Sequence, residues 1–541
     1  MLCCKATYTL LSGPAFLREA FTYTMKHILS GALICLLSLL SFNVISAETP
    51  PAISLSFRTG AGANEGQGVA VGSNGTIYST GQYSGTGTFG STTLTNGGAQ
   101  DYYLSAHSPD GTPLWAVRAG STLSDFGSDV ALDKNGDVVV VGVAGRTTPG
   151  DTVDFNNVTN VAGFGLQDAF IAKYNSSRTL LWVRFAGGTG NDQAYDVAVD
   201  SANNYVISGR VNGLANFDGT IIGTSSQVHS FIAKYDSEGH VLWVQDGGQM
   251  DSSATTGVAV DYSNNTYLSG VSTSSSAPFV AKYNSAGSLQ WKKVATGGTT
   301  SFNENSAVDV DATGNVYVAG RFGTTSITFG TTSDVTLSNP SGLTLGYLVK
   351  YDSAGTAQWA AVTGARAFDV AIGVDGSVYV VGFTSGFGNG NVTVGSQTVP
   401  NSGSLDPFVA KFTTAGALVW VQYSGTSGSD TGRAITLSSD SIYITGEGVS
   451  DLFDNFPGGA YVAKLSLPPT VPTLSISIVG SELVISWEPD FTGFQIETTT
   501  DLSIPFSATA LSFAPVGGQA NTYSLAKPGN NLFIRLSKPA S

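Results

Sequence analysis

The stretch FIAKYNSSRTLLWVRFAGGTGNDQAYDVAVDSANNYVISG, residues 170–209, holds the pattern that decides the fold. It contains four short segments, FIAKY, LLWVRFAG, YDVAVD and NYVISG, that are rich in β-branched and aromatic residues and separated by Gly, Asn, Asp and Ser. Segments of this length and composition are typical of β-strands. The pair Asn203-Asn204 between the last two segments tolerates positive φ and favours a tight hairpin. We therefore expect antiparallel strands here.

The same order of segments recurs along most of the chain. The copies of NYVISG end on a glycine, and from Gly81 to Gly446 these glycines advance in six steps of about 61 residues. The seven copies are GTIYSTG (75–81), GDVVVVG (136–142), NNYVISG (203–209), NNTYLSG (264–270), GNVYVAG (314–320), GSVYVVG (376–382) and DSIYITG (440–446). Four antiparallel strands repeated seven times predict an all-β fold, a seven-bladed β-propeller, with an open β-solenoid as the alternative.

One tryptophan stands in the last strand of each of six repeats. These residues are Trp115, Trp182, Trp243, Trp291, Trp359 and Trp420. Because a blade is buried on both faces by its neighbours, a large aromatic side chain at one repeated place indicates blade-to-blade packing. A role in stacking against a ligand is the alternative.

The repeats also predict how the ring closes. The seventh repeat ends after its third strand, YVAKL (461–465), whereas ISLSFRTG (53–60), ahead of the first repeat, aligns with LLWVRFAG (180–187). We therefore expect residues 53–60, at the N-terminal end, to supply the missing fourth strand of the seventh blade. Pairing the two ends of the propeller in one sheet also removes exposed sheet edges.

The combination FIAKY…LW…GG…VAVD…NYVISG resembles the repeat of the bacterial β-propeller repeat (SBBP) proteins, over roughly residues 53–466. The resemblance implies a propeller in a secreted or surface protein and assigns no activity. The fourth repeat departs from the pattern, because it lacks the Gly/Thr-rich insert between Gly270 and Phe279.

The first 47 residues differ from the rest of the chain. Met25-Lys26-His27 begins a short basic segment, residues 28–45 form the apolar run ILSGALICLLSLLSFNVI, and Ser46-Ala47 ends it with small residues. This order is typical of a signal peptide cleaved after Ala47, with Met25 as the start and residues 1–24 as an upstream extension. An uncleaved membrane anchor is the alternative, because the apolar run approaches the length of a spanning helix.

The composition of the mature chain argues against several classes of protein. All three cysteines lie in the leader, which excludes disulfides, thiolate metal sites and cysteine nucleophiles from residues 48–541. Loss of Lys5, Arg18, Glu19 and Lys26 with the leader takes the net charge from -15 to -17. No nucleic-acid partner is expected, because phosphate binding needs basic patches. No later segment is long and apolar enough to span a membrane.

A proline-rich stretch divides the mature chain. Residues 467–473, which begin LPPTVP, predict a stiff linker between a propeller at 48–466 and a second domain at 474–541. The second domain holds short strand-like segments and one tryptophan, Trp487. We expect a small β-sandwich that resembles fibronectin type III or Ig-like modules. Its role is either surface attachment or that of a plain accessory module.

No catalytic, metal or cofactor site is expected from the sequence. His107, His229 and His240 fall at different places in different repeats, which favours isolated structural or surface roles. The segment from Asp133 to Asp137 looks like a calcium loop but lacks the glutamate that an EF-hand needs, so we expect a hairpin turn. The chain has no nucleophile-elbow, zinc-protease or P-loop motif.

Five polar residues form the candidate ligand-binding set. Counting back five residues from the start of each first strand gives Asp or Asn in five repeats, at Asn64, Asp125, Asp192, Asn303 and Asp430. All should lie in loops between blades, on the face where the Gly/Thr-rich inserts emerge. They either cap backbone N–H groups of those loops or form a polar, acidic ring for a cation or a hydroxyl-rich ligand.

Together these features predict a secreted or cell-surface, non-enzymatic binding or scaffold protein with an extracellular ligand such as a glycan or a surface protein. The alternative is an extracellular polysaccharide lyase or hydrolase, which needs acid and base groups that converge in one pocket. Propellers host many functions, so the fold by itself does not choose between these two classes.

Overall fold

The computed structural model describes residues 48–467 apart from short gaps, and beyond Leu467 it describes seven strands. The gaps are residues 146–152, 156–157, 162, 251–255, 273–276, 298–303, 331–334, 341–342, 386–390, 402–403, 426–427 and 449–457. The chain divides into two units, Ile45–Pro468 and Met1–Val44 with Pro469–Ser541. The predicted leader and residues 468–473 of the predicted linker lie outside the described residues.

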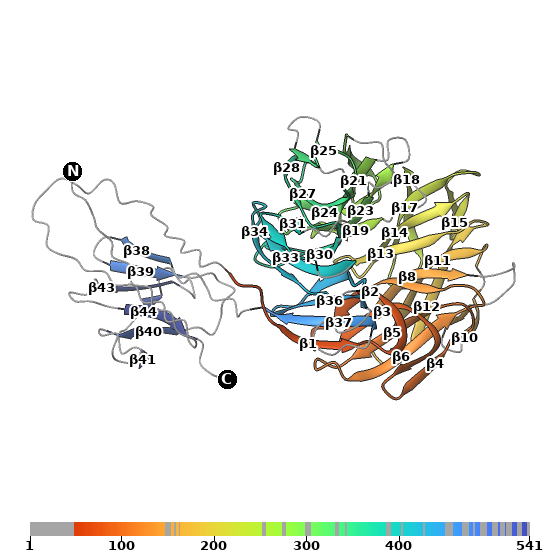
Figure 1. Ribbon diagram of the computed structural model, residues 1–541, viewed down its shortest axis with the longest axis horizontal. Helices are drawn as coiled ribbons and strands as arrows, with labels where there is room; N and C mark the ends of the chain where they lie inside the picture. Colours follow the sequence, from red (N-terminus) through yellow and green to blue (C-terminus); the bar gives the residue numbers. More distant parts are fainter. Residues whose placement is uncertain are drawn as a thin grey trace, which may run out of the picture. The chain divides into compact units, whose positions relative to one another are not determined.

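Residues 48–467 form a seven-bladed β-propeller without a helix among the described residues, which confirms the predicted fold class at this level. Each blade is an antiparallel sheet, and the blades stand around a common centre (Figure 1). The innermost strands are β2 (Ala61–Val71), β7 (Phe126–Leu132), β13 (Gln193–Val199), β19 (Gly257–Val260), β23 (Glu304–Val310), β29 (Arg366–Ile372) and β35 (Thr431–Leu437).

The two central rows of strands are almost entirely buried. The second strands are β3 (Ile77–Phe89), β8 (Val138–Gly145), β14 (Tyr205–Asn212), β20 (Thr266–Ser272), β24 (Val316–Phe322), β30 (Val378–Ser385) and β36 (Ser441–Gly448). The third strands are β5 (Asp101–His107), β11 (Gln167–Tyr174), β17 (Val228–Tyr235), β21 (Ala277–Tyr283), β27 (Leu345–Tyr351), β33 (Leu405–Phe412) and β37 (Gly459–Ser466). All eight residues of β8 are buried. Such strands read as continuous apolar runs because a neighbouring blade covers each face.

The outer row completes the blades. The outer strands of the first six blades are β6 (Pro113–Gly120), β12 (Leu180–Gly188), β18 (Val241–Gln249), β22 (Leu289–Val294), β28 (Ala357–Val362) and β34 (Leu418–Tyr423). In the seventh sheet, β1 (Ile53–Arg58) is hydrogen-bonded along β37, with Phe57 opposite Val462 and Arg58 opposite Tyr461.

The hydrophobic core lies between blades. One cluster joins Val139 and Ile171 of the second blade to Tyr205 and Phe231 of the third, and another joins the fifth blade to the sixth. Because a blade is only one sheet thick, its apolar side chains are buried by the neighbouring blades rather than within the blade.

The tryptophans of the outer strands pack blade to blade, as predicted. The indole N–H of Trp182 donates to the carbonyl of Ser237, in the β17–β18 turn of the next blade, at 3.0 Å. Gly239 of that turn has a φ of +82°, and a Cβ there would lie 2.9 Å from the indole. The arrangement recurs for Trp243 with Ser285 and Gly287, Trp291 with Ser353 and Gly355, and Trp359 with Thr414 and Gly416.

Hairpins inserted between second and third strands reach onto the preceding blade. The insert strands are β4 (Thr92–Thr95), β9 (Val153–Phe155), β10 (Val158–Val161), β15 (Ala215–Phe217), β16 (Thr220–Ile222), β25 (Ser326–Phe329), β26 (Val335–Ser338), β31 (Val392–Val394) and β32 (Gln397–Val399). β9 pairs with β6, and β15 pairs with the end of β12, where Asn216 lies opposite Gly187. These inserts emerge on the same face as the loops that join successive blades, as predicted.

The opposite face carries tight turns fastened by aspartates. Asp133 Oδ1 accepts hydrogen bonds from the backbone N–H groups of Asn135 and Asp137, at 2.8 and 3.0 Å. The buried Nζ of Lys173 lies 3.0 Å from Asp133 Oδ2. The segment is therefore a turn, as predicted, and its first carboxylate is neutralised by a lysine.

The described strands beyond Leu467 form two antiparallel sheets. One has the order β38-β39-β43-β42 and the other the order β41-β40-β44. The strands are β38 (Ser475–Val479), β39 (Glu482–Ser486), β40 (Gln495–Thr499), β41 (Ser507–Ala508), β42 (Ala514–Pro515), β43 (Thr522–Ala526) and β44 (Phe533–Ser537). Trp487 lies outside the described residues.

Candidate functional site

Six innermost strands carry a β-bulge at the same step. In β7, Gly127 lies opposite Gly142 and Asp129 opposite Val141, so Ser128 has no partner in the ladder. The extra residues at this step, which we call the bulge residues, are Gln67, Ser128, Tyr195, Ser306, Phe368 and Arg433. A bulge re-aims the side chain of its extra residue relative to the regular alternation of a strand.

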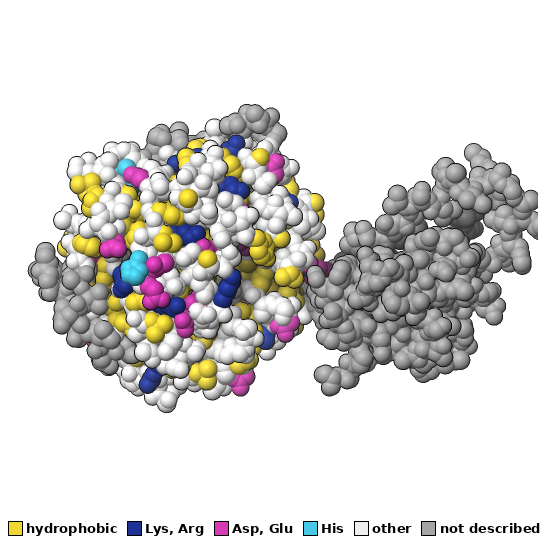
Figure 2. Space-filling model, turned by 180° about the vertical axis from the view of Figure 1, so that it is seen from behind, with side chains coloured by type: hydrophobic (Ala, Val, Ile, Leu, Met, Phe, Trp, Pro, Cys, Tyr) yellow, Lys and Arg dark blue, Asp and Glu magenta, His cyan; other side chains and the backbone are white. Residues whose placement is uncertain are grey.

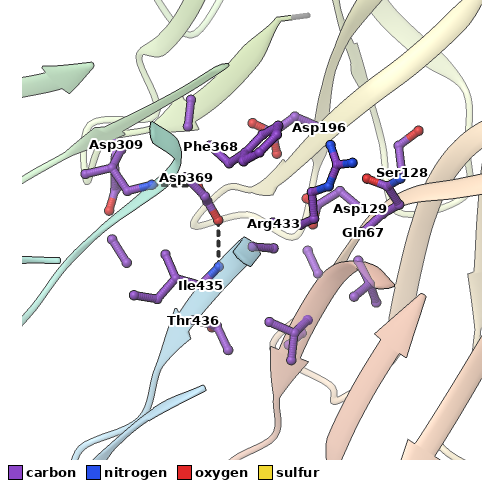
Figure 3. Close-up of a pocket in the computed structure, with 18 of the residues that line it drawn as sticks. Gln67, Ser128, Asp129, Asp196, Asp309, Phe368, Asp369, Arg433, Ile435 and Thr436 are labelled. Atoms are coloured by element: carbon purple, nitrogen blue, oxygen red, sulfur yellow. Dashed lines mark hydrogen bonds between the residues drawn. The ribbon is translucent and has the colours of Figure 1, made fainter. Parts of the chain in front are cut away.

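Bulge residues line a cavity at the centre of the ring. This central cavity has a volume of about 700 Å³ and is bounded by the inner strands of all seven blades. Its lining includes Gln67, Ser128, Tyr195, Phe368, Arg433 and, at the corresponding place ahead of β19, Thr256. Figure 3 shows several of these side chains around the cavity, with Arg433 near Phe368.

The residue type at the bulge position varies from blade to blade, whereas the residue type two positions later stays the same or nearly so. The bulge position presents an amide, hydroxyls, a phenol, a phenyl ring and a guanidinium. The later position is always Val or Ile: Val69, Val130, Val197, Val258, Val308, Val370 and Ile435. Packing of like blades favours one residue type at an equivalent place. The variation therefore marks the part of the repeat that packing leaves free.

Four aspartates of the cavity wall link neighbouring blades. Asp129, Asp196 and Asp369 directly follow bulge residues, and Asp309 stands where the other inner strands have alanine or threonine. Each carboxylate accepts a hydrogen bond from a backbone N–H of the next inner strand, at 2.7–3.2 Å: Asp129 from Val197, Asp196 from Val258, Asp309 from Ile372 and Asp369 from Ile435. Figure 3 marks the bond between Asp369 and Ile435. The aspartates thereby satisfy donors on the free edges of the sheets.

Burial raises the pKa of these four carboxyl groups. The pKa of Asp309 rises to about 7. Burial also raises the pKa values of Asp129, Asp196 and Asp369, and the negative charge of Asp196 adds to the shift at Asp129. Such carboxyl groups hold protons at pH values at which exposed aspartates are charged. The cavity is therefore less negative than its aspartates alone would suggest.

Two guanidinium groups lie over the ring of Phe368. The guanidinium carbon is 4.0 Å from the ring centre for Arg366 and 4.5 Å for Arg433, within the range of cation–π attraction. Arg433 also forms an ion pair with Glu65, and Gln82 Nε2 donates to the other oxygen of Glu65 at 3.0 Å. This part of the wall therefore combines an aromatic face with cationic donors.

The predicted ligand-binding residues Asp125 and Asp192 lie outside the lining of this cavity. Asp125 is buried, and its carboxylate accepts hydrogen bonds from the backbone N–H groups of Ser121 and Gly145, at 2.7 and 2.5 Å. Asp192 holds two backbone N–H groups in the same way. Burial raises the pKa of both carboxyl groups to about 7. These contacts are those of loop caps, the first of the two predicted roles.

Of the other three members of that predicted set, Asp430 alone has a side chain that the structure describes. Asp430 is buried just ahead of β35. Asn64 belongs to β2, but its side chain lies outside the described residues, as does the whole of Asn303. The structure thus places Asp125, Asp192 and Asp430 in separate inter-blade loops, and a ligand-binding role for them stays a prediction.

One histidine has an arrangement that the sequence does not suggest. His229 in β17 is buried, with Nδ1 2.9 Å from Asp246 of β18 and Nε2 3.1 Å from the hydroxyl of Thr224. When Asp246 accepts from Nδ1–H, Nε2 accepts from the Thr224 hydroxyl. The three side chains therefore stand in the order nucleophile, base and orienting acid. They lie outside the lining of the central cavity.

The other two histidines have structural surroundings, as expected. His107 is buried with Nε2 3.2 Å from the carbonyl of Thr59, and burial lowers its pKa to about 4, which keeps the ring neutral. His240 lies in an exposed turn, 3.1 Å from Asp236.

Charged groups on the surface are dispersed. On the face that Figure 2 shows, acidic and basic side chains are interspersed among uncharged ones. Within the described ranges, no three His, Cys, Asp or Glu side chains are grouped as around a metal ion. The same residues include no helix with the length and apolar character needed to cross a bilayer.

The predicted site residues include neither the bulge residues nor the aspartates that follow them. A usable pattern was present, because Asp129, Asp196 and Asp369 stand directly before a Val-Ala pair in three repeats. The residue directly before the start of the first strand, and not the fifth residue before it, is the aspartate in these repeats. The bulge itself could not be read, because an extra residue changes which side chains face the centre without altering the apolar pattern.

No family model matches this chain. A WD repeat-containing protein of Acanthamoeba polyphaga mimivirus is 25% identical to it over 272 residues, which are 48% of this chain and 17% of that protein. The regulatory protein FlaEY of Caulobacter vibrioides is 24% identical over 343 residues, which are 56% of this chain and 35% of that protein. The chain thus spans well under two thirds of either relative. The first match supports a propeller-like repeat protein.

Two solved structures illustrate the likeness of fold. A polysaccharide lyase is 10% identical, with a TM-score of 0.40, over 75% of this chain and 91% of that protein. A gluconolactonase from Xanthomonas campestris is 12% identical, with a TM-score of 0.31, over 61% of this chain and 91% of that protein. At these identities the likeness is one of fold alone.

Proposed function

We propose that this protein is an exported, non-enzymatic binding protein whose central cavity takes a carbohydrate. One observation carries the proposal: equivalent bulge positions hold chemically different side chains, while the packing positions beside them are uniform. A scaffold alone gives no reason for this contrast. A ligand that contacts each blade through a different side chain explains it.

The lining suits a hydroxyl-rich ligand. Tyr195 and Phe368 supply aromatic faces for the C–H face of a sugar ring, and Gln67 and Ser128 supply polar partners for its hydroxyl groups. Ser128 lines the cavity, and its buried Oγ has no hydrogen-bond partner among the described residues, so rotation of its side chain toward the cavity would let a ligand hydroxyl satisfy it. The cavity volume of about 700 Å³ falls within the range of small-ligand sites, about 300–1,000 Å³.

Binding is tested with a glycan array probed with the full-length protein, followed by calorimetry on each glycan retained. We expect Tyr195→Ala and Phe368→Ala to lose most of the binding while the protein stays folded. Tyr262→Ala is the matched control, because this ring is 83% exposed in a turn outside the cavity. Equal affinity of all three variants and the unaltered protein would remove the cavity from the proposal.

Export, family and the C-terminal unit belong to the same proposal. Support for export is the order of basic, apolar and small residues that ends at Ala47. Support for membership of the SBBP proteins is the repeat itself, and support for a fibronectin type III or Ig-like sandwich is the pair of antiparallel sheets beyond Leu467. N-terminal sequencing of secreted protein should begin at Glu48. A cytoplasmic protein, or a start far from Glu48, contradicts export with this cleavage.

We further propose that β1 closes the ring. The ring of Phe57 packs against Gly111, in the outer turn of the first blade, where a Cβ would lie 2.6 Å from it. Ahead of β1, the carboxylate of Glu48 lies 2.8 Å from Lys411 Nζ and 3.4 Å from the indole nitrogen of Trp420. Elsewhere such an indole meets a turn of the next blade. Here the N-terminal segment takes that place.

A second candidate function is an extracellular hydrolase, and the observation that favours it is the trio Thr224, His229 and Asp246. The Thr224 hydroxyl would attack an ester carbonyl as His229 Nε2 takes its proton. The proton then passes to the departing alcohol, and water releases the acyl group from Thr224. Binding in the cavity is the preferred function, because the trio lies outside the lining and Thr224 is exposed.

The two functions are separated by turnover of p-nitrophenyl acetate. The hydrolase alternative expects turnover that is lost in both Thr224→Val and His229→Gln. The binding proposal expects the same low rate from the unaltered protein and both variants.

A further inference from the structure

We infer that the sugar held in the central cavity carries a carboxylate, as a uronic acid does, and that Arg433 recognises it with Arg366 beside it. The inference rests on the proposed carbohydrate binding and names the class of ligand for that site.

The recognising groups come from two neighbouring inner strands. Arg366 and Phe368 belong to β29 and Arg433 belongs to β35, and all three line the cavity. Both guanidinium groups lie over the same phenyl ring, within 4.5 Å of its centre. A guanidinium that stacks on a ring keeps its N–H donors in its own plane, where a planar carboxylate can meet them.

Arg433 has a donor that none of the described residues uses. Its Nη2 pairs with Glu65, whereas its Nε is buried with no hydrogen-bond partner among the described residues. With a shift of the side chain that brings Nε to the cavity, a carboxylate can accept from Nε and a neighbouring Nη together, and such charge-assisted pairs are strong hydrogen bonds. A neutral hydroxyl group makes a weaker bond to only one of these donors. A carboxylated sugar therefore satisfies this part of the wall better than a neutral sugar does.

The charge of the wall favours the same ligand. Guanidinium groups stay charged at every physiological pH. Burial raises the pKa of Asp369, and that of Asp309 to about 7, so at neutral pH these groups carry less negative charge than exposed aspartates and repel an anion less. Among the acids near Arg433, Glu65 is its ion-pair partner, Glu447 has a pKa raised by burial and by Glu65, and Asp430 is buried just ahead of β35. Cationic donors thus persist where most of the acids are neutral or paired.

The rest of the lining explains why the anion is expected on a sugar. Tyr195, Gln67 and Ser128 present hydroxyl and amide groups from other blades toward the same cavity. A ligand that uses both parts of the wall must carry several hydroxyl groups and one carboxylate. A uronic acid residue carries both.

The test is calorimetry of the full-length protein with two probes of equal length, an oligogalacturonate and the neutral galacto-oligosaccharide. We expect the uronate to bind more tightly by about tenfold or more, the scale of a charge-assisted hydrogen bond. Arg433→Gln and Arg366→Gln should reduce that preference, because each should weaken binding of the uronate more than binding of the neutral sugar.

Three further variants keep the result interpretable. The double variant Glu65→Gln with Arg433→Gln removes the ion pair without leaving one charged partner alone. Arg433→Lys keeps the charge but has no Nε fork, so it should lose most of the preference for the uronate. Arg178→Gln is the matched control, because Arg178 is an exposed arginine in a turn outside the cavity. Thermal unfolding establishes that each variant is folded.

The outcomes distinguish the inference from the function on which it rests. If both sugars bind equally and Phe368→Ala weakens both, carbohydrate binding stands and the carboxylate inference is wrong. If a sulfated galacto-oligosaccharide binds as tightly as the uronate, recognition is of anions in general and the carboxylate assignment fails. A preference that survives in Arg433→Gln overturns the role of this arginine. Binding of none of these sugars contradicts both the inference and the proposed cavity function.

Discussion

Two regions of the propeller differ in how far their residues repeat from blade to blade. One is the outer seam, where the outer-strand tryptophans contact turns of the next blade, and the other is the central wall, where the inner strands line the cavity. At the seam, Trp182 and its three equivalents meet the same kind of turn, with a carbonyl acceptor and a glycine at positive φ. At the wall, equivalent bulge positions hold residues as different as Gln67, Phe368 and Arg433. A position that must fit the next blade is repeated, and a position that faces the cavity is free to differ.

The aspartates of the wall share one property with the seam and one with the bulge positions. They bond across blade boundaries as the tryptophans do, but they occur in only part of the ring. At two equivalent places the chain has Gly68 and Gly257 instead, where a Cβ would lie 2.7 Å from the backbone of Asp129 and 2.9 Å from that of Ala307. Four pairs of neighbouring inner strands are therefore joined by a carboxylate bridge and two by closer approach of their backbones, while the ion pair of Arg433 with Glu65 joins β35 to β2.

The largest effect is expected from removing the segment that we propose closes the ring. Deletion of residues 48–60 removes β1 and the contacts of Phe57 and Glu48, and leaves the edge of β37 unpaired. We expect a loss of about 5 kcal/mol or more, because apolar side chains of the seventh blade become exposed. Urea unfolding measures it, and an unchanged midpoint contradicts ring closure by β1.

The seam is tested next. Trp182→Ala should lower the free energy of unfolding by about 3 kcal/mol, because the indole fills the contact with the next blade. Trp182→Phe, which keeps much of the packing and loses the hydrogen bond to Ser237, should cost about 1 kcal/mol. Sugar binding by the folded fraction should not change. If Trp182→Ala instead abolished binding at unchanged stability, the alternative of ligand stacking would hold.

The wall aspartates predict how stability depends on pH. Asp309 has a pKa of about 7 in the folded protein, whereas an unfolded chain gives aspartate a pKa of about 3.9. Between these values the folded state holds a proton that the unfolded state has released, so stability falls as the pH rises from about 4 to about 7. We expect the folded protein to be about 2 kcal/mol less stable at about pH 8 than at about pH 5 from this group, since one pKa unit corresponds to about 1.4 kcal/mol.

Asp309→Asn should flatten this slope in chemical unfolding measured at both pH values. Asp236→Asn is the control, because the pKa of this turn aspartate is lowered and its titration lies below the range. A slope that is identical in Asp309→Asn and the unaltered protein would place the titrating groups elsewhere.

The smallest effect on stability is expected at the bulge itself. Ser128→Ala should change the free energy of unfolding by less than about 0.5 kcal/mol, because the hydroxyl has no partner within the part of the chain that the structure describes. Sugar affinity should fall by about fivefold, the scale of one hydrogen bond of about 1 kcal/mol. Calorimetry and thermal unfolding of the same variant check both values. A loss of stability like that of Trp182→Ala would make the bulge a packing feature and erase the contrast between seam and wall.

The features that recur in every blade could be predicted from the sequence, and most of the features that differ between blades could not. The strand order, the blade number, the tryptophan contacts and the Asp133 turn follow from local pattern and regular spacing. Of the predicted site residues, Asp125 and Asp192 have the contacts of loop caps. The spacing before each first strand located these residues in the inter-blade loops. It could not tell whether their carboxylates face a ligand or are buried, because burial depends on how the loop folds around them.

By itself, the sequence determined that the chain forms strands in seven like groups, because apolar runs, turn residues and tryptophans recur at one period. Only the tertiary structure decided which side chains meet. The bulge turns Gln67, Phe368 and Arg433 toward one cavity from positions far apart in the chain. The folded chain also brings Asp369 to Ile435 across a blade boundary, and Thr224 to His229 beside a hairpin. The physical reason is that a period fixes the neighbours along a strand, whereas closure of the ring fixes the neighbours across its centre.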